Sequence, residues 1–181
     1  ANAELTIESG TIIKGDKATK GSLIITRGSK IFALGNASEP VIFTSGEALG
    51  TRTYGDWGGL IILGRAPIND PAGEKVIEGG IDAVKGLYGG TDVADNSGIL
   101  EYVRIEFPGI AFQPNNEING LTCGGVGNGT TINNIQVSYS GDDSYEFFGG
   151  TVNCKNLISY RGVDDDFDTD FGFSGNLQFI V

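Results

Sequence analysis

The sequence predicts an all-β protein, specifically a right-handed parallel β-helix (solenoid) of six to eight coils with one protruding loop. Three observations support this fold class: short β-branched runs fill the chain, glycine is frequent throughout, and segments recur at regular intervals along the chain. No long stretch has the apolar periodicity of an amphipathic helix. The expected secondary structure is therefore strands joined by tight turns.

The predicted strands are short apolar runs bounded by Gly, Asn, Asp and Ser. In chain order they are LTIESGTIIKG, SLIITRGSKIFALG, PVIFTS, GGLIILG, LEYVRIEF, INNIQVSYS, KNLISY and NLQFIV. Glycine makes up 30 of the 181 residues, which is more than twice the average share of roughly 7%. Because it recurs every few residues, it indicates many turns and not a single flexible linker.

Three internal repeats predict how the coils stack. The apolar pattern of residues 5–13 recurs at 23–31, that of residues 103–109 recurs at 135–141, and the turn pattern of residues 142–146 recurs at 164–168. Coils of a parallel solenoid stack at about 4.8 Å and cannot bury their apolar faces alone. Repeats of this length are typical of solenoids, so each interval is interpreted as one coil.

The whole chain, residues 1–181, is predicted to be a single β-helix domain. Residues 65–98 break the repeat and contain Pro67, Pro71 and five glycines, so we expect an inserted loop that leaves the solenoid and returns. No run approaches the roughly 18 apolar residues of a membrane span, so no transmembrane segment is expected in this chain.

Composition excludes several function classes. Lys and Arg number 12 against 23 Asp and Glu, so the net charge of -11 argues against nucleic acid and anionic membranes as partners. Histidine is absent, which excludes Ser-His-Asp and Cys-His catalysis, and no catalytic residues can be assigned. Cys123 and Cys154 do not form a CxxC pair, and the sequence leaves open a disulfide or two free thiols.

Four segments carry a family resemblance: GDWGGLIILGRAPIN, NSGILEYVRIEF, GDDSYEFFGGTVN and DDDFDTDFGFSG. With the rest of the chain they resemble a family of exported right-handed parallel β-helix proteins of gram-negative bacteria. The resemblance implies a cell-surface or lipoprotein type, mostly without assigned activity, and an extracellular or outer-membrane-associated location. Such proteins continue with further coils, so the resemblance implies that this chain is the N-terminal portion of a longer solenoid.

The most unusual stretch is RGVDDDFDTDFGFSG, residues 161–175. As an extended strand it would turn the aromatic residues toward the core, while four carboxylates face solvent: Asp164, Asp166, Asp168 and Asp170. The third repeat places Glu146 beside Asp168 on adjacent coils. Like charges directly opposed across strands are destabilising.

A bound hard cation would offset this repulsion, and calcium is the candidate cofactor because it accepts six to eight oxygens in flexible geometry. The candidate metal ligands lie on two adjacent coils and are Asp142, Asp143, Glu146, Asp164, Asp166 and Asp168. An EF-hand beginning at Asp164 is excluded, because Thr169 and Gly175 stand where it needs Gly and Glu. The alternatives are a solvated acidic ridge that keeps the solenoid soluble and a catalytic carboxylate cluster.

Two function classes remain open. The favoured one is a non-enzymatic exported or cell-surface protein, adhesin-like or a structural component with a protein partner in an assembly. The other is a polysaccharide-binding or polysaccharide-degrading protein, in which Lys155 or Arg161 beside calcium-bound carboxylates would take a proton from a uronate, as in β-helical lyases. Arg161 has a simpler interpretation as a salt-bridge partner of the aspartates, and Trp57 is either a sugar platform or a core residue.

Overall fold

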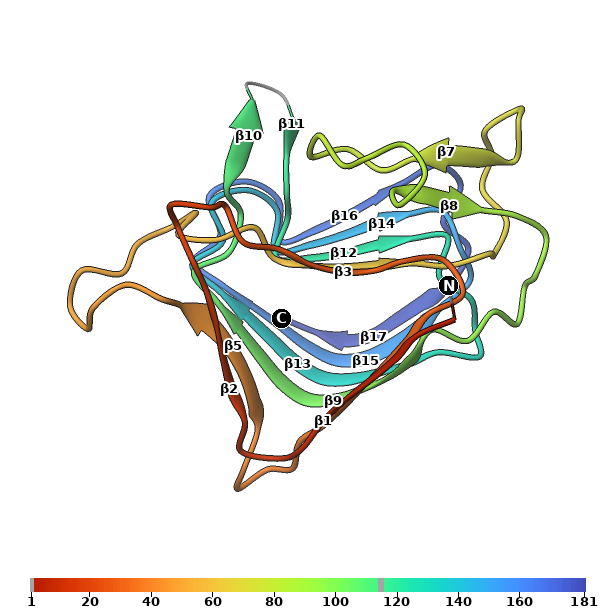
Figure 1. The fold of residues 1–181 in the computed structure, drawn as a ribbon. Helices are drawn as coiled ribbons and strands as arrows, with labels where there is room; N and C mark the ends of the chain where they lie inside the picture. Colours follow the sequence, from red (N-terminus) through yellow and green to blue (C-terminus); the bar gives the residue numbers. More distant parts are fainter. Residues whose placement is uncertain (1, 114–115) are drawn as a thin grey trace.

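The computed structural model describes residues 2–113 and 116–181, which form a right-handed parallel β-helix (Figure 1). Its largest sheet runs in the order β1 (Glu4–Ile7), β4 (Lys30–Leu34), β9 (Gly98–Glu106), β13 (Thr131–Ser138), β15 (Asn153–Tyr160) and β17 (Asn176–Ile180). The same sheet includes β2 (Ile12–Gly15) and β5 (Val41–Ser45), and β5 pairs with β9. All these pairings are parallel.

A second parallel sheet closes the solenoid on the opposite side (Figure 1). Its order is β3 (Leu23–Ile25), β6 (Leu60–Leu63), β12 (Leu121–Gly124), β14 (Tyr145–Phe148) and β16 (Phe167–Asp170). Two antiparallel hairpins lie outside the coils, one of β7 (Glu74–Val76) with β8 (Leu87–Gly89) and one of β10 (Ala111–Gln113) with β11 (Asn116–Glu117). No helix in the described part of the chain is long and apolar enough to cross a membrane.

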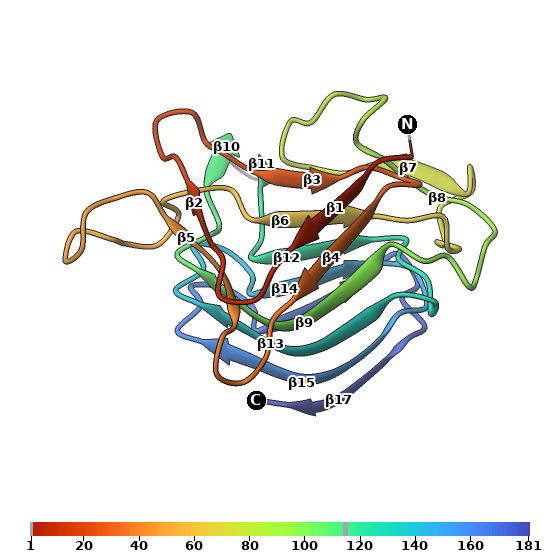
Figure 2. The same ribbon diagram turned by 60° about the horizontal axis from the view of Figure 1, so that its bottom comes forward.

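The long strands of the first sheet each bend at one residue with a left-handed backbone. These residues are Tyr102 in β9, Asn134 in β13 and Asn156 in β15, with φ of 51°, 56° and 56°. The residues of β9 before the bend pair with β4, and those after it pair with β5. One strand therefore contributes to two faces of the coil, which gives the coil three faces with the second sheet (Figure 2).

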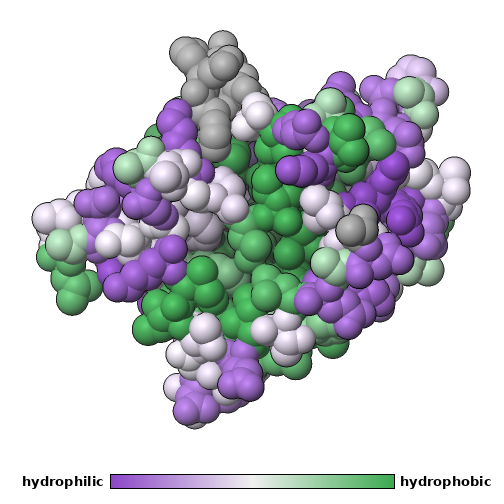
Figure 3. All heavy atoms as spheres, in the orientation of Figure 1, coloured by the Kyte–Doolittle hydropathy of each residue, from purple (hydrophilic) through white to green (hydrophobic). Residues whose placement is uncertain are grey.

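Stacked apolar side chains fill the inside of the coils. Fully buried rows include Val103, Ile135 and Leu157 after the bends, and Leu121 and Tyr145 in the second sheet. Burying an aliphatic or aromatic side chain of this size contributes about 1.5–3 kcal/mol. At the end formed by β1 to β3 the core is open to a hollow of about 720 Å³, and apolar side chains are visible there (Figure 3).

The three sequence repeats give a mixed result. Val103 pairs with Ile135 and Glu146 with Asp168, so the second and third repeats are confirmed as coil spacings. The first repeat is wrong as a coil spacing: Leu5 pairs with Ile31 and not with Leu23, which lies in the second sheet. All faces of a coil need the same alternation of apolar residues, so two faces of a single coil, β1 and β3, imitate a repeat.

Residues 64–97 lie between β6 and β9 and carry the β7–β8 hairpin across the outer surface of the second sheet (Figure 1). This hairpin and its connections cover a second apolar cluster, separate from the inside of the coils. Its buried members are Ile61, Leu63, Ile77, Tyr88, Ile118 and Phe148. The outer surface of β12 and β14 is consequently shielded from water.

Trp57 and the two cysteines belong to the interior. Trp57 is 3% exposed and donates from Nε1 to the backbone oxygen of Glu106 at 2.8 Å, so it is a core residue and not a sugar platform. Cys123 and Cys154 are both buried and free, and Cys154 is in register with Ile132. Burial raises the pKa of both thiols above the ordinary value.

Candidate acidic site on the outer face of the second sheet

Three polar side chains form a row across three neighbouring strands. Thr122 of β12 is in register with Glu146 of β14, and Glu146 is in register with Asp168 of β16. In this part of the sheet, Tyr145 and Phe147 point into the coils, so the residue between them points outward. The row therefore lies on the outer face of the sheet.

The row is buried at Thr122 and Glu146 although it faces outward. Glu146 is 6% exposed and Thr122 is 2% exposed, because the segment between β6 and β9 covers this face. Asp143, in the turn before β14, is 9% exposed. The alternative of a solvated acidic ridge therefore does not hold for Glu146 and Asp143. Of the four aspartates expected in solvent, Asp164, Asp166 and Asp170 are exposed, whereas Asp168 is partly buried.

Asp143, Glu146 and Asp168 each offer a carboxylate oxygen, and the three oxygens lie within 4.8 Å of one another. Asn119 Nδ2 donates to Glu146 Oε2. Glu78, which follows β7, also hydrogen-bonds to Glu146, carboxyl to carboxyl. Two carboxylates in such contact require a shared proton or a cation between them.

Two further oxygens at this site lack partners. Asn119 Oδ1 and Thr122 Oγ1 are buried and make no hydrogen bond within the described residues, and their side chains are 1% and 2% exposed. A buried polar atom without a partner costs about 1–3 kcal/mol. With the three carboxylates, these oxygens supply the hard ligands that calcium prefers.

Burial and mutual repulsion disfavour negative charge on all three carboxylates, Asp143, Glu146 and Asp168, at the same time. Burial, together with the charges of Glu78, Asp143 and Asp168, raises the pKa of Glu146 well above its ordinary value. Burial also raises the pKa of Asp143 to about 7, although Asp143 Oδ1 accepts a hydrogen bond from the backbone N–H of Asp165 at 2.9 Å. The site therefore favours either protons or a bound positive charge at neutral pH.

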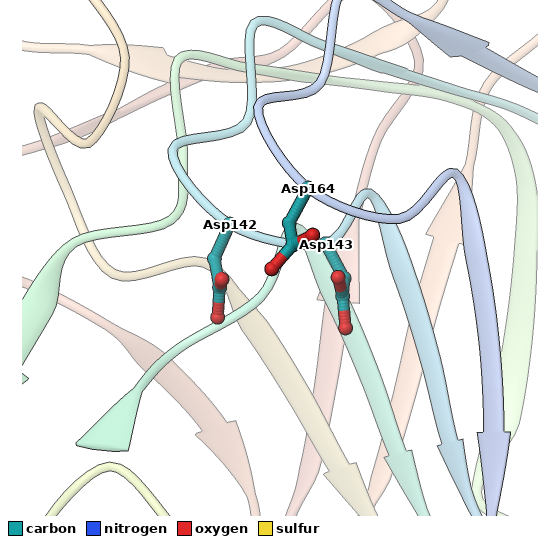
Figure 4. Close-up of side chains that lie close together, drawn as sticks. All are labelled: Asp142, Asp143 and Asp164. Carbon is teal, nitrogen blue, oxygen red and sulfur yellow. The ribbon is translucent and has the colours of Figure 1, made fainter. Parts of the chain in front are cut away.

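A second acidic group adjoins the first at the turns before β14 and β16. It consists of Asp142, Asp143 and Asp164, whose oxygens also lie within 4.8 Å of one another (Figure 4). Asp164 is exposed and Asp142 is partly exposed, so this group is open to solvent. Asp143 belongs to both groups and connects the buried site to the surface.

Asp166, also a candidate ligand, lies apart from both groups. Its Oδ1 accepts a hydrogen bond from Ser159 Oγ at 2.6 Å, and Ser159 Oγ lies 2.7 Å from Ser144 Oγ. The chain bends at residues 164–166 before β16 begins, so the strict alternation expected from Asp164 to Asp170 does not hold there. The alternation fails again at Phe171, where φ is 48°.

Comparison with known proteins identifies the fold family. The family model described as a pectate-lyase like beta helix domain matches residues 1–181, the whole chain. The chain belongs to this family. Searches of curated proteins and of solved structures give no match.

Within this pectate-lyase-like domain, the two basic residues considered for catalysis lie on the first sheet or at its end. Lys155 is an exposed residue of β15 in register with Asn133. The Arg161 guanidinium lies over the rings of Tyr139 and Tyr160, at 5.9 and 5.4 Å from their centroids. The structure thus gives Arg161 a stacking role in place of the expected salt bridge.

Sequence reasoning missed Asn119, Thr122 and Glu78. Thr122 stands opposite Glu146, but the strand sequences LTCG and YEFF share no chemical pattern that would reveal this register. Glu78 comes from the inserted segment, and no repeat places that segment on a particular face. The usable signal was that Asn119 shortly precedes a buried strand next to the acidic coils.

Proposed function

We propose that this pectate-lyase-like β-helix is a non-enzymatic module whose buried acidic site binds a hard divalent cation, Ca²⁺ being the candidate. Asp143, Glu146 and Asp168 supply the charge. The observation that carries the proposal is the pair of unpartnered oxygens on Asn119 and Thr122 beside those carboxylates. An acidic cluster without such neutral ligands would be equally consistent with protonation alone.

The role of the cation would be structural. The three carboxylates come from the coils of β14 and β16, and the neutral oxygens come from the coil of β12. Through the contact of Glu146 with Glu78, the site also reaches the inserted segment. A bound cation would therefore hold three coils together and fasten the inserted segment to the sheet.

The test is a comparison of melting temperatures in chelator and in millimolar calcium for the wild type and two matched variants. A ligand at a hundred times its Kd stabilises by about 2.7 kcal/mol, which at roughly 2–4 °C per kcal/mol corresponds to about 5–10 °C. We expect Asp168→Asn to remove this response. Asp166→Asn, an equal change in charge two residues away, should retain it because Asp166 lies outside the site.

Two results would refute the proposal. One is a wild-type melting temperature that does not respond to calcium. The other is equal loss of the response in Asp166→Asn and Asp168→Asn, which would indicate a general effect of surface charge and not a site.

Membership of a pectate-lyase-like family supports a second candidate function, polysaccharide binding or cleavage. A lyase of the kind considered above needs a base beside the metal-bound uronate. Arg161 lies over the rings of two tyrosines, and Lys155 lies on the first sheet. Neither residue is therefore placed to act as a base beside a uronate bound at Glu146. We expect no unsaturated product, measured by ultraviolet absorbance, when the protein is incubated with calcium and uronate polysaccharides; product formation that Arg161→Ala abolishes would establish the lyase function.

We further propose that the protein lies outside the cytoplasm, at the cell surface and associated with the outer membrane, where a partner protein of a surface assembly would contact it. Membership of the pectate-lyase-like family supports an extracellular location. Calcium sites of extracellular modules work at the high calcium concentrations found there, which suits a structural calcium site. Fractionation of the native host followed by immunodetection tests this, and recovery of the protein in the cytoplasmic fraction alone would contradict it.

A further inference from the structure

A groove runs along the outer side of the strand bends in the first sheet, on a different sheet from the acidic site. Its volume is about 670 Å³, within the range of roughly 300–1,000 Å³ typical of small-molecule sites. The bends of β9, β13, β15 and β17 form its floor, and the loop between β4 and β5 forms its wall. Figure 2 shows the course of these strands. The floor-lining side chains at the bends are Tyr102, Asn134, Asn156 and Phe179.

The wall of this groove is held in place by its own hydrogen bonds. Gly35 N donates to the backbone oxygen of Glu101 at 2.9 Å, next to the bend. A side chain at Gly35 would meet the backbone oxygen of Tyr102 at 2.3 Å, so only glycine permits this approach. Asn36 Oδ1 accepts from the backbone N–H groups of Ser38 and Glu39, which closes the loop as an Asx turn. The groove is therefore preformed.

The four bend residues place two aromatic rings and two amides along the groove. All four have positive φ: 51° at Tyr102, 56° at Asn134 and Asn156, and 60° at Phe179. Asparagine tolerates this left-handed conformation, whereas bulky aromatic residues adopt it at a cost. Tyr102 and Phe179, in the first and last of the four strands, thus adopt a conformation that asparagine would satisfy better. Phe107 and Tyr139 adopt the same conformation outside the groove, so the assignment depends on the groove and its lining and not on backbone strain.

The chemistry of the lining favours a neutral, hydroxyl-rich ligand. Asn134, Asn156 and Gln136 line the groove with amides, which both donate and accept hydrogen bonds as hydroxyl groups do. Asn156 Nδ2 donates to Asn133 Oδ1 and Gln136 Nε2 donates to Ser138 Oγ, both at 2.9 Å, so each of these two amides offers a ligand its oxygen and its second N–H. The charge of Arg104 is compensated by Glu106, with 3.0 Å between Nη2 and Oε1. Because the protein has a net charge of -11, an anionic chain would also be repelled at long range.

The repeat of the floor favours a chain-like ligand. Tyr102, Asn134 and Asn156 each immediately precede residues in register on successive coils, namely Val103, Ile135 and Leu157. Phe179 precedes Ile180, which is in register with Leu157. The rungs therefore recur at about 4.8 Å along the solenoid axis, a distance close to the length of one pyranose unit in an extended glycan.

We propose that this groove binds an extended neutral oligosaccharide along the solenoid axis, with Tyr102 and Phe179 as stacking platforms and Asn134, Gln136 and Asn156 as hydrogen-bonding partners of its hydroxyl groups. Aromatic faces pack against the apolar faces of sugar rings, and amides between them fix the register of the hydroxyl groups.

The experiment is calorimetric titration of the protein with linear oligosaccharides of glucose, mannose and xylose, beside an oligogalacturonate of equal length. The informative variant is Tyr102→Asn, because the same residue type already occupies the equivalent position in β13 and β15. It should fold, melt no lower than the wild type, and bind the neutral glycan at least about tenfold more weakly, as loss of one stacking contact implies. Phe179→Asn should behave in the same way.

The matched control is Tyr139→Asn, which makes the same substitution at a residue with φ of 57° on another bend, outside the groove. It should leave glycan affinity unchanged. Absence of binding by all three neutral oligosaccharides at millimolar concentration would overturn the proposal. So would binding that is unaffected by both Tyr102→Asn and Phe179→Asn, or tighter binding of the oligogalacturonate in this groove.

Discussion

The burial of Asp143 makes the stability of the metal-free protein depend on pH in an unusual direction. A carboxyl whose pKa is raised in the folded state stabilises the fold when protonated, and this contribution is lost as pH rises through the folded pKa. For Asp143 the pKa rises from 3.8 to about 7. At about 1.36 kcal/mol per pKa unit, ionisation of buried Asp143 lowers the free energy of unfolding at pH 8 by about 4 kcal/mol.

More than half of this penalty is recovered when the pH falls from 8 to 5, because Asp143 is then protonated in the folded state. With chelator present, we expect the melting temperature, followed by far-ultraviolet circular dichroism, to rise by roughly 5–10 °C over that range. The raised pKa of Glu146 acts in the same direction. Calcium should remove much of this pH dependence of the melting temperature, since it stabilises the ionised carboxylates.

The matched variants are Asp143→Asn and Asp82→Asn. The amide introduced by Asp143→Asn would keep an oxygen to accept the Asp165 N–H but would carry no charge, so this variant should melt higher than the wild type at pH 8 in chelator and show a flatter pH profile. Asp82 is an exposed turn residue whose Oδ1 accepts from Val84 and Lys85, and its variant should retain the wild-type profile. A wild-type melting temperature that falls between pH 8 and pH 5 in chelator would refute this reasoning.

Three further outcomes follow from the fold. Trp57→Ala should lower the free energy of unfolding by about 3–5 kcal/mol in urea titration, because the side chain is 3% exposed; a loss under about 1 kcal/mol would contradict its core position. Gly98→Ala should abolish folding, since φ is +114° and the added Cβ would lie 1.9 Å from a backbone oxygen of β4. Gly73→Ala, at φ +71° with open space around the added Cβ, should lower the free energy of unfolding by only about 1 kcal/mol. Equal melting temperatures for the two variants would count against this stacking of the coils. Thiol titration without reductant should detect Cys123 and Cys154 in denaturant and neither in the native protein, and detection of no thiol in denaturant would indicate a disulfide.

The sequence was informative about the fold where successive coils have similar turns. The coils of β14 and β16 differ only by short turns, so the offset from Glu146 to Asp168 is visible as a repeat in the sequence. The interval from Val103 to Ile135 is longer, and the β10–β11 hairpin lies within that coil. The first coils have dissimilar turns, and the apparent repeat of residues 5–13 at 23–31 aligns β1 of the first sheet with β3 of the second.

For the candidate site, the sequence indicated which residues are acidic neighbours but not which of them are buried. Burial of Glu146 depends on the segment between β6 and β9, which has no repeat and packs on the outer face of the sheet through long-range contacts. Asn119 and Thr122 were missed for the same reason, since their importance comes from burial without partners and not from residue type. Metal binding itself stays a prediction.

A crystal structure of the full chain grown in calcium tests the central claim most directly. We predict a calcium ion bounded by Asp143, Glu146 and Asp168, at about 2.3–2.6 Å from their oxygens, with Asn119 Oδ1 or Thr122 Oγ1 turned toward it. Ordered calcium bound to Asp142 and Asp164 alone, or a buried site holding only protonated carboxyls hydrogen-bonded to one another at saturating calcium, would contradict it.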